Sequence, residues 1–231
     1  MKINGIKCSI VAALVFAASS SYGQNLNPYV QLNAGVAYGL APKGDFNKKA
    51  MKKSGVYSVE VGSKLHDNFR AGLSVDYRNN FTHKYNASYV EDGVNHNESS
   101  RIKVKSLAVM ANFYYDLAKI GTFTPYLTAG MGVALNKAGE HVTVADYGYH
   151  SVDGKGSKTN FAFKVGAGTK FAINDRLEFD LRYQFADLGK FQTGYSHKDY
   201  LNGTLVRQIT SEKAKGRLKS HEIMAGLTYK F

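Results

Sequence analysis

Seven histidines are the residues of this sequence best suited to acid–base or metal chemistry. Enzymes that remove or transfer lipid acyl chains need a histidine and a serine on one face of a strand. That requires a His-x-Ser spacing, because neighbouring strand residues point to opposite faces. The sequence offers only adjacent pairs, such as His150-Ser151, and a loose Asp146, His150, Asp153 set that resembles many loops. We therefore expect no enzyme, no metal site and no cofactor.

Lysine, arginine and tyrosine in the long polar stretches indicate binding rather than catalysis. The chain has a formal net charge of +12 and no tryptophan, but 16 tyrosines. Exposed cations attract acidic or sulfated molecules, and tyrosines often dominate binding energy at interfaces. The predicted surface comprises Lys48, Lys49, Lys52, Lys53, Tyr147, Tyr149, Lys198, Tyr200 and Arg207. A second interpretation, that such cations neutralise lipopolysaccharide phosphates, stays open beside host binding.

A different set of charged residues alternates strictly with uncharged ones. In eight segments one face is apolar or small, and the opposite face carries acids and bases in nearly equal numbers. Lysine or arginine facing lipid at mid-bilayer costs roughly 2–4 kcal/mol, which explains an uncharged face. Glycines between the charged residues leave room for long side chains. The predicted interior network comprises Glu60, Arg70, Asp76, Arg78, Asp116, Lys164, Lys170, Asp180, Arg182 and Glu222.

The connections between these segments are short and long in turn. The short ones are 66–68, 118–123 and 174–176, and the long ones are 41–54, 82–101, 137–158 and 187–216. Outer-membrane barrels have tight periplasmic turns and long extracellular loops. The pattern predicts an all-β fold, an eight-stranded antiparallel up-and-down transmembrane β-barrel with a polar filled interior, closed by pairing of the last strand with residues 29–40. So small a barrel, with charged side chains inside, leaves little open lumen.

Both ends of the chain carry export features. Residues 1–23 read as a signal peptide, with Lys2 and Lys7 before the apolar run IVAALVFAA, and residues 24–231 as the barrel domain. The run is about half of the roughly 20 residues that a membrane helix needs. The only cysteine, Cys8, falls within the signal. The closing strand resembles the last strand of bacterial outer-membrane barrels, which implies that Tyr229 and Phe231 are read by the barrel assembly machinery.

Several stretches resemble a known superfamily. TPYLTAGMGVA (124–134), KVGAGTKFAINDRLEFDLRYQFADLGK (164–190) and HEIMAGLTYKF are similar to opacity-protein and OmpA-like eight-stranded barrels. From PYVQLNAGVA (28–37) onward the layout is similar to rickettsial surface adhesins. The resemblance implies an outer-membrane location and attachment to host cells or to serum and matrix proteins.

The combined prediction is a surface adhesin or host-factor-binding barrel that acts through its basic loops. The alternative is a structural barrel that supports envelope integrity, and a lipid-modifying enzyme is a distant third. Expected partners are outer-membrane lipid and lipopolysaccharide, the assembly machinery and a host surface or matrix protein. We expect a monomer and no nucleic acid partner.

Overall fold

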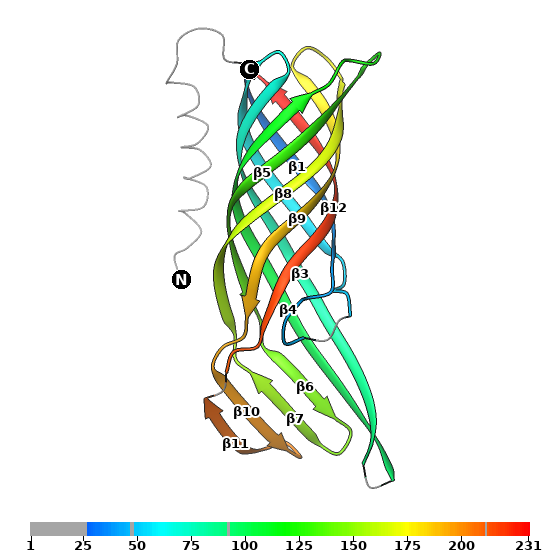
Figure 1. The fold of residues 1–231 in the computed structure, drawn as a ribbon, viewed down its shortest axis with the longest axis vertical. Coiled ribbons are helices and arrows are strands. Elements are labelled where there is room, and N and C mark those ends of the chain that lie inside the picture. Colours follow the sequence, from blue (N-terminus) through cyan, green and yellow to red (C-terminus); the bar gives the residue numbers. More distant parts are fainter. Residues whose placement is uncertain (1–26, 47–48, 92, 211) are drawn as a thin grey trace.

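The structure, a computed structural model, describes residues 27–46, 49–91, 93–210 and 212–231. The expected signal peptide, residues 1–23, and the candidate binding residue Lys48 lie outside these ranges. The regular elements of the described residues are all β-strands (Figure 1). The described part of the chain holds no helix long and apolar enough to cross a membrane.

Eight strands form a closed antiparallel ring, as predicted. They pair in the ring order β1 (Asn27–Gly39), β2 (Ser54–His66), β3 (Phe69–Glu91), β4 (Val94–Asp116), β5 (Phe123–Ala138), β8 (Gly156–Ala172), β9 (Leu177–Gln192) and β12 (Lys215–Lys230). The ring closes between β1 and β12, from Tyr29 opposite Lys230 to Gly39 opposite Ser220. The predicted seam between the first and last strands is therefore confirmed.

Alternation along each barrel strand decides which side chains point outward. On β12, Ile223, Leu227 and Tyr229 are exposed on the barrel wall, whereas Glu222 and Met224 point inward and are buried. The other barrel strands show the same alternation of exposure. The outer wall is therefore an uncharged band, as lipid contact requires.

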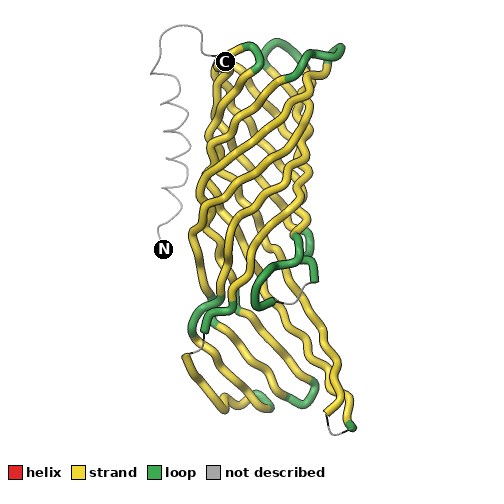
Figure 2. The backbone as a smooth tube through the Cα atoms, viewed as in Figure 1, coloured by secondary structure: helices red, strands yellow, loops and turns green. Residues whose placement is uncertain are grey.

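The two ends of the barrel differ. Short turns at residues 67–68, 117–122 and 173–176 lie at the end where the C-terminus is marked in Figure 1, and Figure 2 shows them as brief loops between long strands. The start of β1 lies at this end too, because Tyr29 pairs with Lys230. The long connections therefore all emerge at the opposite end, called the distal end below.

The distal connections are largely strands, which corrects their description as loops. Residues 82–101 continue β3 and β4 as a paired hairpin from Phe81–Val104 to Glu91–Val94. The two later connections contribute β6 (His141–Ala145), β7 (Tyr149–Asp153), β10 (Ser196–Leu201) and β11 (Thr204–Thr210). These four add to β4 in the order β6, β7, β10, β11. With the distal halves of β3 and β4 they form a six-stranded extension sheet that projects from the barrel (Figure 1).

The distal part of the barrel interior is apolar, which corrects the expectation of a polar filling along its whole length. The connection 40–53 folds back and buries Phe46 and Met51, and the Phe46 ring centroid lies 5.2 Å from that of Phe191. Inward positions farther along the strands add fully buried Phe81, Ile102, Leu188 and Leu218. This apolar core closes the distal end of the barrel beneath the extension sheet.

Candidate functional site

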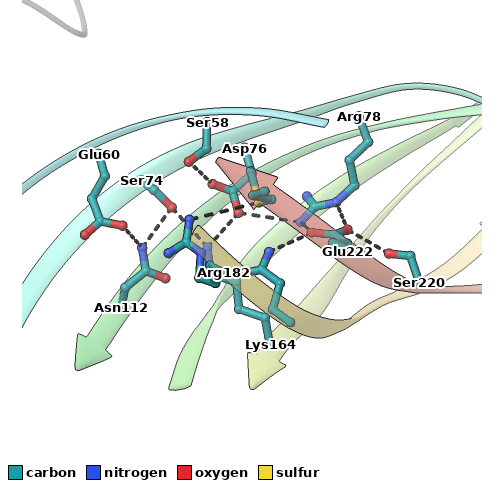
Figure 3. Close-up of polar contacts among 12 residues, drawn as sticks. Ser58, Glu60, Ser74, Asp76, Arg78, Asn112, Lys164, Arg182, Ser220 and Glu222 are labelled. Carbon is teal, nitrogen blue, oxygen red and sulfur yellow. Dashed lines mark hydrogen bonds and ion pairs between the residues drawn. The ribbon is translucent and has the colours of Figure 1, made fainter. Parts of the chain in front are cut away.

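Buried ion pairs hold the strands that carry the extension sheet (Figure 3). Arg78 donates to Glu222 through Nε and Nη2, at 2.6 and 3.0 Å, and its Nη2 lies 3.6 Å from Asp76. Lys164 Nζ donates to Asp76 at 2.8 Å. These four side chains are at most 2% exposed. They tie β3, β8 and β12 together across the interior.

A second ion-pair network lies nearer the short-turn end. Arg70 donates to both carboxylate oxygens of Asp116, at 2.9 to 3.1 Å. Lys170 Nζ donates to Asp116 at 2.7 Å and lies 4.0 Å from Glu178. Lys230 in turn lies 3.1 Å from Glu178, so the network reaches the last strand.

Between the two networks, Glu60 is held by neutral donors. It accepts hydrogen bonds from Tyr29 at 2.8 Å, Asn112 at 2.7 Å and Tyr114 at 2.6 Å. Arg182 donates to the Tyr114 hydroxyl at 3.0 Å. A buried carboxylate needs such hydrogen bonds, because an unsatisfied one would pay its full desolvation cost.

Three interior tyrosines, Tyr29, Tyr114 and Tyr126, were missed by the sequence prediction. Tyr126 donates to Asp180 at 2.6 Å, and the Arg70 guanidinium lies 4.4 Å from the Tyr114 ring centroid. Each of these tyrosines alternates with the exposed apolar residues of its strand and so occupies an inward position. That alternation was the available signal, but the predicted interior network comprised charged residues alone.

Glycine makes room for the long interior side chains. Gly130 pairs with Lys164 across β5 and β8, and a methyl group at Gly130 would come within 3.0 Å of Lys164 Cε. Gly168 pairs with Arg182, and the Tyr126 ring covers the space where its side chain would lie. With these positions open, ten charged side chains and three tyrosines fill the barrel interior between the short turns and the apolar core. The extension sheet therefore continues from a barrel whose interior is filled with side chains and linked across strands by ion pairs.

The extension sheet has two chemically different faces. The inner face continues the barrel interior, since on β4 it follows Val104 and Ile102, and the outer face continues the barrel wall. The register from β4 to β10 places the carboxylates Glu98, Asp153 and Asp199 on the inner face. The outer face carries Lys84, Arg101, Lys103 and Lys198.

Histidines and carboxylates pair on the inner face. His197 Nδ1 lies 2.6 Å from Asp153 and its Nε2 lies 2.9 Å from Asp199. His141 Nδ1 lies 2.9 Å from the other oxygen of Asp153. Tyr149 donates to Asp199 at 2.6 Å. The hydrogen bond from Tyr149 and the nearby His197 lower the pKa of Asp199, which keeps this carboxylate charged.

The structure divides the predicted binding residues among three places. Lys49, Lys52 and Lys53 are exposed on the connection 40–53. Tyr147 stacks beside Tyr149, their ring centroids 5.9 Å apart, and His96 packs on Tyr147 at 5.3 Å. Register places Tyr149 and Arg207 on the inner face and Lys198 and Tyr200 on the outer face. These residues therefore lie on the connection 40–53 and on both sides of the extension sheet, and they do not form one patch.

The loose metal-site arrangement of Asp146, His150 and Asp153 does not form. His150 is on the outer face, stacked on Tyr200 at 4.4 Å, while Asp153 is on the inner face. Asp146 accepts hydrogen bonds from Asn97. Within the described ranges, no three His, Cys, Asp or Glu side chains are grouped so that they could hold a metal ion.

His197 on the inner face should titrate above the usual range for histidine. The hydrogen bond to Asp153, with Asp199 close by, raises the pKa of His197 from its ordinary value of about 6.5. The stabilisation from protonated His197 is complete below about pH 6.5 and is lost as pH rises through the higher folded-state pKa. NMR titration should show the pKa of His197 falling in Asp153→Asn. An unchanged titration curve would contradict the pairing.

Comparison with known proteins places this geometry in context. The family model for the outer membrane protein beta-barrel domain matches residues 8–231. Outer membrane protein PagN of Salmonella typhimurium is 28% identical over 75% of this chain and 71% of its own length. A candidate adhesin of Rickettsia conorii is 26% identical over 96% of this chain and 90% of its own length. Neisserial surface protein A has a similar fold, with a TM-score of 0.53 at 17% identity, covering 90% of this chain and 100% of that one.

Proposed function

Because this chain belongs to the outer membrane protein beta-barrel domain family, we propose that it is a bacterial outer-membrane adhesin whose extension sheet binds a host surface or matrix protein. The barrel anchors the protein in the outer membrane. The extension sheet lies at the end opposite both the start of β1 and the C-terminus, which is the extracellular end in barrels of this kind.

The observation that carries this proposal is exposed apolar surface on strands beyond the lipid-facing wall. Val206 and Leu205 on β11 are 58% and 46% exposed, and Val90 at the tip of β3 is 67% exposed. Lipid cannot cover residues at that position. These side chains lie on β3 and β11, the two edge strands of the extension sheet, where a protein partner could cover them.

The free edge of the sheet suits a protein partner as well. β11 pairs only with β10, and all of its residues are exposed. An unpaired edge offers backbone donors and acceptors to an extended segment of another chain. The similarity to PagN and to candidate rickettsial adhesins supports a role at the cell surface.

The remaining partners follow from the location. We propose that lipopolysaccharide surrounds the barrel and that the assembly machinery reads Tyr229 and Phe231, whose side chains are 41% and 68% exposed at the end of β12. We also propose that the barrel is a monomer, since its ring is closed by its own strands. We propose no nucleic acid partner and no catalytic activity.

Removing the short distal strands tests adhesion. A variant in which residues 139–155 and 193–214 are each replaced by a short turn keeps all eight barrel strands intact. Bacteria expressing it should attach to host cells no better than bacteria lacking the protein. Retained heat-modifiable gel mobility would show that the variant barrel still folds.

Undiminished attachment by this variant would overturn the adhesin proposal. The structural alternative, a barrel that supports envelope integrity, is favoured by the dense interior ion pairs. It predicts normal attachment but leakage of periplasmic enzymes when the whole chain is deleted. The two functions therefore give opposite results in the same pair of assays.

A further inference from the structure

Five cations form a ladder on the outward side of β3, β4 and β5. Lys84 lies directly opposite Arg101, and Lys105 lies directly opposite Lys137. Lys103 lies between the two pairs, two residues from Arg101 and two from Lys105 on the same face of β4. All five side chains are exposed. We call Lys84, Arg101, Lys103, Lys105 and Lys137 the basic ladder.

The described part of the chain does not neutralise the basic ladder. Like charges directly opposite each other across strands destabilise a sheet. None of the five side chains forms an ion pair with a described carboxylate. The carboxylates Glu98, Asp153 and Asp199 are on the inner face, and Glu140 is engaged with Lys155 at 3.5 Å. A ligand with several negative charges would offset this repulsion.

The position of the basic ladder indicates which polyanion fits. Leu107 and Leu135 form the last apolar cross-strand pair of the outer wall, and Lys105 and Lys137 form the next pair on the same face. Two residues along a strand span about 6.8 Å. Lys105 and Lys137 therefore lie where the hydrocarbon of the outer leaflet meets its headgroups. Lys103, Arg101 and Lys84 are farther toward the distal end and lie in the headgroup layer.

We propose that the basic ladder binds a multiply phosphorylated glycolipid of the outer leaflet. Its phosphates would contact Lys105 and Lys137 first and then Lys103 and Arg101, while its acyl chains lie on Leu107 and Leu135. A soluble sulfated polysaccharide offers similar anionic groups but has no acyl chains for the wall below. The exposed apolar residues that carry the adhesion proposal, Val90, Leu205 and Val206, are not part of the basic ladder, so a chain that binds the glycolipid but no host cell would overturn adhesion alone.

Matched glutamine variants test the proposal. The ladder variant combines Lys103→Gln, Lys105→Gln and Lys137→Gln. The control combines Lys43→Gln, Lys155→Gln and Lys190→Gln, which removes the same charge from exposed positions elsewhere at the distal end. The probes are purified lipopolysaccharide, the same material after enzymatic dephosphorylation, and heparin, each titrated against the folded protein in detergent.

The ladder variant should bind intact lipopolysaccharide about tenfold to a hundredfold more weakly than the unmodified protein, because each cation near an anionic lipid surface contributes to affinity. The control variant should bind it as the unmodified protein does, and dephosphorylation should abolish the difference. Equal weakening of both variants, or loss of heparin binding alone by the ladder variant, would overturn the proposal.

A second measurement does not depend on binding. In detergent free of lipopolysaccharide, the ladder variant should unfold at a higher temperature than the unmodified protein, because three mutually repelling charges are gone. Adding lipopolysaccharide should raise the unfolding temperature of the unmodified protein more than that of the variant. A ladder variant that is less stable without the glycolipid would show that these cations already have partners within the chain.

Discussion

Replacing Arg78 with alanine is expected to destabilise the folded barrel by about 3–5 kcal/mol, because the change leaves a buried carboxylate without its cation. Arg78 is bound to Glu222 at 2.6 and 3.0 Å, and both side chains are at most 1% exposed. Gln184 and Ser220 also donate to Glu222, but they carry no charge. Urea unfolding of the protein in lipid vesicles measures the loss.

Two comparisons make that result specific. The double variant Arg78→Met, Glu222→Met should be more stable than Arg78→Ala, since apolar side chains of similar volume can replace a buried ion pair at little cost. Lys64→Ala should cost at most about 1 kcal/mol, because its 3.4 Å pair with Asp67 is exposed. Equal losses for Arg78→Ala and Lys64→Ala would contradict the interior network.

Replacing Phe191 with alanine is expected to cost about 3–5 kcal/mol and to loosen the distal end of the barrel. Phe191 is fully buried and packs against Phe46, which the connection 40–53 inserts into the apolar core. Without this contact, the connection should detach more often. Trypsin should then cut at Lys52 and Lys53 faster, which gel electrophoresis of the folded protein measures.

Phe161→Ala provides the control for this second effect. Phe161 is 67% exposed on the outer wall of β8, so its loss leaves the apolar core intact. Cleavage at Lys52 and Lys53 should keep its original rate. If Phe191→Ala also left the rate unchanged, the connection 40–53 would not be held by the apolar core.

Strand alternation explains why the barrel could be predicted. Positions such as Leu107 and Leu227 face lipid and tolerate no charge, whereas Asp76 and Arg182 face a shared interior, so the two faces of each strand differ sharply in the sequence. The alternating lengths of the connections added the topology. Both signals come from the membrane itself, which allows few solutions for backbone and side chains.

The extension sheet could not be predicted in the same way. β6 and β7 have five residues each, and their inner and outer faces both carry polar groups, as His141 and His150 illustrate. Alternation is weak when neither face meets lipid or a continuous core. A clear local signal was Asn202-Gly203, a pair that favours tight hairpin turns and that here has positive φ angles of 49° and 82°.

The apolar core at the distal end was missed for a related reason. Ile102 and Leu218 continue the inward parity of their strands beyond the last charged row, whereas a register shift between Arg78 and Phe81 turns Phe81 inward against the parity of β3. These three residues lie just beside the expected long connections 82–101 and 187–216, and they were assigned to neither face of a strand. Extending the alternation of β4 would have placed Ile102 inside, but extending that of β3 would have placed Phe81 outside, because the register shift is not visible in the sequence.

The most direct test of the account is where the extension sheet lies in living bacteria. Thr204→Cys on β11 and Lys119→Cys in a short turn each place an exposed thiol at one end of the barrel. A membrane-impermeant maleimide should label Thr204→Cys on intact cells and label Lys119→Cys only after the outer membrane is opened. The parental chain provides the background. Labelling of Lys119→Cys but not of Thr204→Cys on intact cells would contradict the account.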